Sequence, residues 1–382
     1  MNKSYCGLLF NEIYSDNKGC YNLCCMAQFD NHLERKFKTK DVTPFEFYLS
    51  EDMNEIREKA LKGERIESCK RCYDEEETIG YSKRLMHNQQ NRNIPPPTSV
   101  GDVTLKLRFL GNACNLSCIS CWPYNSSTKE QELKQTGLKD HFPWSYPKAF
   151  NNNNKEWEFQ KKDILENIDK ISCFHMIGGE PLVTAHHWQL LMEDISDDDA
   201  KNISLKYNTN LTTLSFKDYT LDDLFKKYKD VNLLVSSDHF GDKLHFMRYP
   251  IDVEEFENNL FEVHDHVSQI ACTVQLLNIL EIDEIREYYE TNFKIPVDFG
   301  SYVVGPTFMS IKNLPLEIKK ELIEKHEYVL SGSPPLPRNL FVHELKKRGK
   351  HRGLIKGMEY LDTLGKHRGI DWRKLWGDVV NV

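Results

Sequence analysis

The chain has 382 residues, 40% of them hydrophobic, so it is long enough to bury one large core, or one large and one small core. Its net charge of −8 and its 11% aromatic content are typical of a folded enzyme and indicate no general attraction to nucleic acid. No run reaches the ~18 apolar residues of a membrane span, and the first ten residues are too polar for a signal peptide. We therefore expect a cytoplasmic protein with no membrane or nucleic-acid partner.

The first 90 residues form a cysteine-rich module. Eleven cysteines in a reducing compartment, eight of them in short-spaced groups, favour metal or cluster ligation over disulfides. The candidate ligands here are Cys6, Cys24, Cys69 and Cys72. Only one of the adjacent Cys24 and Cys25 is expected to ligate, and the spacing from Gly19 favours Cys24. Four thiolates suit either an iron-sulfur cluster or zinc, so both metals stay open.

Three consecutive prolines predict a stiff linker at residues 91–100. Beyond it, residues 101–310 alternate short β-branched runs with amphipathic stretches, which predicts a parallel sheet. Strands are expected at Leu105–Phe109, Cys173–Ile177, Ile203–Tyr207, Asn232–Ser236, Ile270–Leu277 and Pro296–Val304. Helices are expected at Phe159–Lys170, His186–Ile195, Leu221–Tyr228, Val253–His264 and Ile282–Thr291. This α/β pattern predicts a partial (β/α)6 TIM-like barrel, with an inserted loop at 123–157 and a helical extension at 311–382.

The most informative motif follows the first expected strand of this barrel. Cys114, Cys118 and Cys121 have C-x3-C-x2-C spacing. A four-thiolate [4Fe-4S] cluster is coordinatively closed, whereas three thiolates leave one iron open to a small molecule. A zinc site is the alternative, but zinc sites usually show paired C-x2-C or Cys/His spacings.

Residues that could contact a ligand stand at or after the ends of the next three expected strands: Gly178-Gly179-Glu180, Asn210, and Ser236 with Arg248. Together with the cysteine motif, they resemble the pattern of the radical S-adenosylmethionine (SAM) superfamily. The resemblance implies that SAM binds the open iron and is reductively cleaved to a 5′-deoxyadenosyl radical, which abstracts a substrate hydrogen. It also implies that Gly178, Gly179 and Glu180 bind the SAM amino group. Asn210 and Ser236 are then expected at the ribose, and Arg248 at the carboxylate, which its planar fork suits.

The N-terminal cysteines resemble the ligand set of twitch or SPASM modules, which bind an auxiliary [4Fe-4S] cluster. Those modules commonly follow the radical SAM domain, whereas here the set precedes it, as in twitch-type proteins often encoded by phages. The resemblance implies a peptide or protein substrate and an electron donor such as flavodoxin or ferredoxin. The alternatives are a nucleotide or sugar substrate, or a non-catalytic zinc or iron-sulfur interaction protein. The reaction outcome stays open.

The C-terminal region is strongly basic. Residues 346–374 hold ten Lys or Arg against three acidic residues, with Trp372 and Trp376 nearby. Basic and aromatic residues together could bind phosphate groups, but we interpret the stretch as a solvated helix.

Overall fold

The computed structural model describes residues 3–16, 18–27, 33, 36–90, 102–108, 111–142, 154–329 and 338–377. Two compact units divide the chain. The first comprises residues Met1–Asn112, Pro147–Asn208 and Ser215–Asn232, and the second Ala113–Tyr146, Thr209–Leu214 and Leu233–Val382. The domains expected at 1–90, 101–310 and 311–382 stay a prediction. The expected linker at 91–100 lies outside the described residues.

A mostly parallel sheet of eight strands has the order β10-β9-β8-β5-β4-β3-β1-β2. Its strands are β1 (Glu12–Ser15), β2 (Tyr21–Asn22), β3 (Val103–Lys106), β4 (Ile171–Met176), β5 (Ser204–Thr209), β8 (Asp230–Ser236), β9 (Val267–Val274) and β10 (Val297–Tyr302). The α/β class and the six expected strands are therefore confirmed. Closure into a partial barrel stays a prediction.

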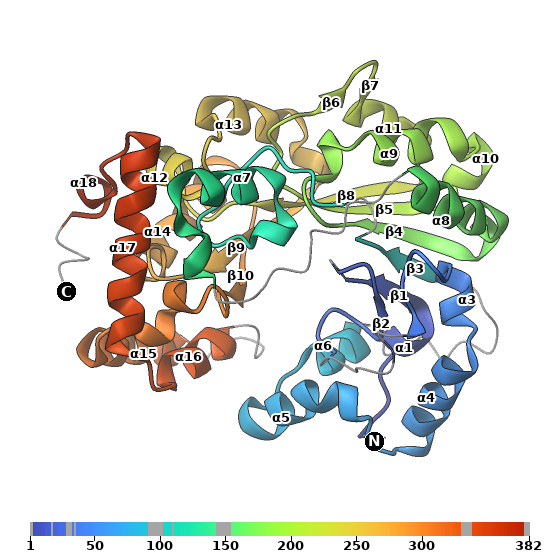
Figure 1. Ribbon diagram of the computed structural model, residues 1–382, viewed down its shortest axis with the longest axis horizontal. Coiled ribbons are helices and arrows are strands. Elements are labelled where there is room, and N and C mark those ends of the chain that lie inside the picture. The colour runs from blue at the N-terminus through green and yellow to red at the C-terminus, as the bar shows by residue number, and fades with distance from the viewer. Residues whose placement is uncertain are drawn as a thin grey trace. The chain divides into compact units, whose positions relative to one another are not determined.

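The first unit contains an additional strand pair that the sequence pattern did not indicate. β1 lies parallel to β3, and β2 pairs antiparallel with β1 (Figure 1). All four β1 residues are buried, so the strand lacks the alternation by which a half-buried strand is recognised. The N-terminal segment thus extends the sheet.

Helices of the first unit flank these strands, together with a short hairpin, β6 (Ser215–Phe216) and β7 (Tyr219–Thr220). They are α1 (Leu8–Asn11), α3 (Pro44–Tyr48), α4 (Glu51–Lys62), α5 (Lys70–Ile79), α6 (Lys83–Gln90), α8 (Asn154–Glu166), α9 (Ala185–Trp188), α10 (Asp197–Ala200) and α11 (Leu221–Lys227). Local signals define α4, because the Ser50 hydroxyl accepts from the Met53 amide and Gly63, at φ 80°, ends the helix. The helix expected at His186–Ile195 divides into α9 and a π-helix at Gln189–Asp194.

The second unit combines β8, β9 and β10 with helices from both ends of its sequence. They are α7 (Ser127–Thr136), α12 (Gly241–Met247), α13 (Val253–Glu262), α14 (Ile282–Asn292), α15 (Leu316–Val329), α16 (Arg338–Lys346), α17 (His351–Arg368) and α18 (Trp372–Trp376). The described part of residues 311–382 contains helices α15 to α18. However, α17 is not a solvated helix, because Tyr360, Leu361, Leu364 and Arg368 are all buried. Along the described residues, no helix is long and apolar enough to cross a membrane.

Candidate functional site: two groups of cysteines

Cys114, Cys118 and Cys121 lie on a loop of the second unit, and all three are half-buried. The loop backbone is held by two hydrogen bonds to the chain around the end of α12. The Ser117 amide donates to the Tyr249 carbonyl over 2.6 Å, and the Ile119 amide donates to the Met247 carbonyl over 2.9 Å. The cysteine loop is therefore fixed at its centre, between the first and third thiols.

A buried ionic cluster supports the same loop. Arg368 of α17 donates through Nε to Glu132 Oε1 over 2.7 Å and through Nη2 to the Ser117 carbonyl over 2.6 Å. Lys129 lies 2.9 Å from Glu132, and both belong to α7. Although burial raises the pKa of Glu132, Lys129 and Arg368 outweigh it and lower that pKa to about 2. The carboxylate is thus charged, and a buried charge of this kind requires its partners.

A second contact from α17 reaches the loop about two turns before Arg368. The Tyr360 hydroxyl donates to the Ile119 carbonyl over 2.9 Å, and the tyrosine side chain is fully buried. Two carbonyls between Cys114 and Cys121 therefore accept hydrogen bonds from the C-terminal extension. The sequence interpretation missed these supports, and the only available signal was the presence of Arg368 and Tyr360 within an amphipathic pattern.

Arg248 lies against the central cysteine. Its Nη1 is 3.9 Å from Cys118 Sγ, and its Nε is 2.9 Å from the carboxylate of Asp238. The Thr273 amide donates to the other Asp238 oxygen over 3.0 Å, which holds the carboxylate in place. Burial raises the pKa of Cys118, and the positive charge of Arg248 opposes that shift. The structure thus brings together the expected Arg248 and one expected cluster ligand.

Asn210 and Ser236 occupy different surroundings. The Asn210 amide nitrogen donates to Asn115 over 3.0 Å, next to Cys114, and its oxygen accepts from the Thr212 amide over 3.1 Å. Asn210 therefore connects the end of β5 to the cysteine loop. Ser236 ends β8 with a half-buried side chain.

Gly178, Gly179 and Glu180 follow β4 in the first unit. Gly178 has φ 92° and Gly179 φ 53°, a region that glycine adopts without steric cost. A Cβ at Gly178 would lie 3.4 Å from the Arg108 side chain, so the backbone there packs closely. Glu180 is buried, and its Oε1 accepts from the Leu182 amide over 3.1 Å. The glutamate thus caps the turn that follows, and its oxygens can accept further hydrogen bonds.

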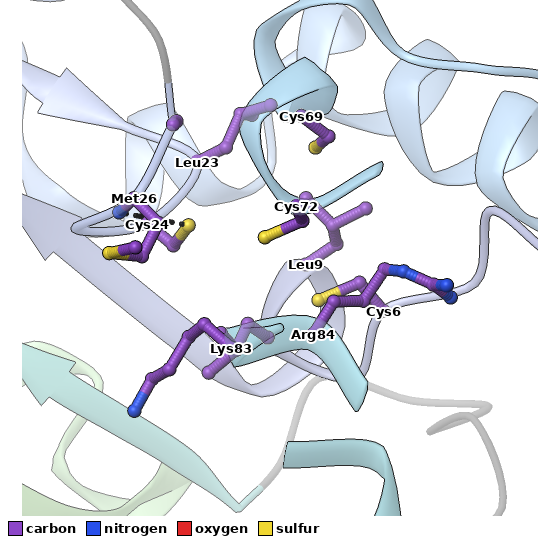
Figure 2. Close-up of a pocket in the computed structure, with 11 residues that line it drawn as sticks. Cys6, Leu9, Leu23, Cys24, Met26, Cys69, Cys72, Lys83 and Arg84 are labelled. Atoms are coloured by element: carbon purple, nitrogen blue, oxygen red, sulfur yellow. Dashed lines mark hydrogen bonds between the residues drawn. The ribbon is translucent and has the colours of Figure 1, made fainter. Parts of the chain in front are cut away.

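The four N-terminal candidates line one pocket of the first unit. Cys6, Cys24, Cys69 and Cys72 surround it together with apolar side chains such as Leu9 and Leu23 (Figure 2). Cys24 is among the lining residues and Cys25 is not, and Cys25 is exposed. The structure therefore places Cys24, as the spacing favoured, at the pocket. In the described ranges, no three His, Cys, Asp or Glu side chains are arranged to hold a metal ion.

The protonation of these thiols follows from the apolar pocket. Burial, with a smaller contribution from the nearby Cys72, raises the pKa of Cys6 and of Cys69 to about 12. The thiols are therefore neutral without a metal, and ligation must release their protons. Four thiols that line one pocket have the donor chemistry of a four-thiolate cluster or of a zinc site.

Comparisons with known proteins give little. No family model and no curated protein matches the chain. A solved structure, that of Streptococcus suis SuiB bound to S-adenosylmethionine, matches with a TM-score of 0.35 and 15% sequence identity. The match covers 58% of this chain and 43% of the SuiB chain. The chain thus spans less than half the length of SuiB, and a similarity this weak carries no argument about function.

Proposed function

We propose that the chain is a radical SAM enzyme, in which Cys114, Cys118 and Cys121 hold a [4Fe-4S] cluster and SAM occupies its open iron. The observation that carries the proposal is the C-x3-C-x2-C loop, with Arg248 against its central thiol. When bound, the cluster would supply the electron that cleaves SAM to methionine and a 5′-deoxyadenosyl radical. The chain's own residues hold the ligands in place and exclude water.

The proposed SAM contacts follow the superfamily resemblance. Gly178, Gly179 and Glu180 bind the amino group, Asn210 and Ser236 the ribose, and Arg248 the carboxylate. Two observations support the proposed binding of the SAM carboxylate by Arg248. Its guanidinium lies beside a cluster ligand, and its Nε is paired with Asp238, which orients the fork.

The pocket lined by Cys6, Cys24, Cys69 and Cys72 is proposed to hold the auxiliary [4Fe-4S] cluster of a twitch or SPASM module. Such a cluster would bind substrate or accept the electron left after hydrogen abstraction. By the same resemblance the substrate is a peptide or protein, with a nucleotide or sugar as the alternative. Flavodoxin or ferredoxin is the proposed electron donor. A non-catalytic interaction protein is the rival function, and it would neither bind nor cleave SAM.

Anaerobic reconstitution tests whether both cysteine groups hold clusters. We expect about eight iron and eight sulfide per chain, four of each for each cluster. The Cys69→Ala/Cys72→Ala variant should retain about four iron and still cleave SAM to 5′-deoxyadenosine. An iron content that stops near about four in the wild type, with zinc present in the N-terminal pocket, would contradict the auxiliary cluster.

Arg248 can be tested without leaving a buried carboxylate unpaired. In Arg248→Met/Asp238→Asn both members of the ion pair are replaced, so the fold should persist. SAM affinity should fall by roughly ten- to a hundred-fold, because a hydrogen bond to a charged group contributes about 1.5 to 3 kcal/mol. Asp238→Asn alone is the matched control and should bind SAM more tightly than the double variant. Equal SAM affinity in the wild type and the double variant, measured by anaerobic calorimetry at equal iron content, would refute this role.

A further inference from the structure

One face of the sheet in the first unit carries a row of ionisable side chains. Glu12 of β1, Lys106 of β3, His175 of β4 and Lys206 of β5 all lie on this face, because side chains two residues apart on a strand share a face. The register that aligns them pairs Glu12 with Thr104, Thr104 with Cys173 and His175 with Lys206. The opposite face is apolar and buried, with Ile13, Leu105, Phe174 and Leu205 at the alternate positions. Four parallel strands thus present ionisable groups side by side.

A third lysine joins this row from outside the sheet. Lys83 of α6 lines the thiol pocket, and its ammonium group points away from the sulfur atoms (Figure 2). Burial, together with the positive charges of Lys106, Lys206 and Lys83, lowers the pKa of His175 to about 3. Burial also lowers the pKa of Lys206, with Lys83 and Lys106 acting in the same direction. The three ammonium groups are therefore close enough to repel one another, and His175 is neutral.

The positive charge of this face is poorly compensated. Among the described residues, no carboxylate forms an ion pair with Lys83, Lys106 or Lys206. Glu12 is the carboxyl group whose charge acts on all three lysines, but it is 8% exposed and burial raises its pKa. Its Oε1 has no hydrogen-bond partner in the described part of the chain. Lys206 is exposed, and Lys83 and Lys106 are half-buried, so a ligand can reach the ammonium groups.

We propose that this face binds a phosphate group of the substrate through Lys83, Lys106 and Lys206, and that Glu12 Oε1 hydrogen-bonds an adjacent polar group of the same molecule. Three point charges without an arginine fork suit a phosphate dianion better than a carboxylate, which carries one charge and favours bidentate arginine. Insofar as it names the substrate, the assignment rests on the proposed radical SAM function. It favours a nucleotide or sugar phosphate over an unmodified peptide.

The test is calorimetric titration of the full chain with inorganic phosphate in low-salt chloride buffer. Wild type should bind, and Lys106→Gln/Lys206→Gln should bind roughly a hundredfold more weakly, because each of the two lost charged hydrogen bonds contributes about 1.5 kcal/mol, which is about tenfold in affinity. The variant removes like charges that repel one another, so we expect it to fold, and circular dichroism checks this. Lys201→Gln is the matched control: this lysine of the same unit has a side chain 69% exposed and should leave phosphate affinity unchanged.

Two further arms identify the source of the phosphate. Tighter binding of adenosine monophosphate than of inorganic phosphate assigns a nucleotide, and tighter binding of ribose 5-phosphate assigns a sugar. Acetate binding as tightly as phosphate would overturn the proposal. Equal phosphate affinity in the wild type and the double variant, or an equal loss in Lys201→Gln, would also overturn it. Because no SAM, reductant or iron is present, failure here is distinct from failure of the proposed radical chemistry.

Discussion

Replacing Cys114, Cys118 and Cys121 together by Ala should abolish the release of 5′-deoxyadenosine from SAM under reducing conditions. In the proposed mechanism only this cluster has an iron without a protein ligand, so no other site can coordinate SAM. About four iron per chain should remain, held by the pocket of the first unit that Cys6, Cys24, Cys69 and Cys72 line. Anaerobic chromatography of 5′-deoxyadenosine together with iron analysis provides the measurement.

The control for this triple variant is Cys25→Ala. Cys25 is exposed and does not line the thiol pocket, so its loss should leave iron content and SAM cleavage at wild-type values. If the triple variant still released 5′-deoxyadenosine at the wild-type rate, the radical SAM proposal would be wrong. If the reconstituted wild type neither bound nor cleaved SAM, the rival non-catalytic function would be favoured.

Arg368→Met should lower the free energy of unfolding by about 3 to 5 kcal/mol, the cost of removing one partner from a buried ion pair. The Arg368 side chain is fully buried, and its Nη1 also donates to the Phe246 carbonyl over 2.6 Å. Its loss leaves Glu132 with Lys129 as its remaining ionic partner and frees the Ser117 carbonyl. Urea denaturation of the metal-free chain measures the stability. After reconstitution, the variant should lose iron from the cysteine loop before it loses iron from the N-terminal pocket.

Arg373→Met is the matched control for the loss of Arg368 from the buried ionic cluster. Arg373 forms an ion pair with Asp362 at 2.9 Å, but the two side chains are 46% and 50% exposed, so its loss should cost at most about 1 kcal/mol. Replacing all three charges together, in Arg368→Met/Glu132→Gln/Lys129→Met, should recover part of the stability, because no buried charge is then left without a partner. If Arg368→Met lowered the free energy of unfolding as little as Arg373→Met does, the buried ionic cluster around Arg368 would not stabilise the loop.

The sequence by itself determined the features that depend on a few neighbouring residues. The alternation of β-branched runs and amphipathic stretches predicted all six strands from β3 to β10 that build the βα part of the sheet. Spacing drew attention to Cys114, Cys118 and Cys121, and the resemblance to twitch or SPASM modules drew attention to the four N-terminal cysteines, which line one pocket. The strand predictions succeeded because hydrophobic period is a local property of the chain. The ligand roles of the cysteines stay predictions.

Only the tertiary structure decided the features that depend on residues far apart in the sequence. β1 pairs with β3 across the N-terminal segment, and its four buried residues carry no strand alternation. Arg368 donates a hydrogen bond to the carbonyl of Ser117, which lies 251 residues earlier in the chain. This arginine was expected on a solvated helix, but it is buried and supports the cysteine loop. Likewise Lys106 and Lys206 look like ordinary surface lysines until register places them on one face with His175. The residue type sets the charge and hydrophobicity of a side chain, but the tertiary fold decides whether that side chain is buried and which residues it contacts.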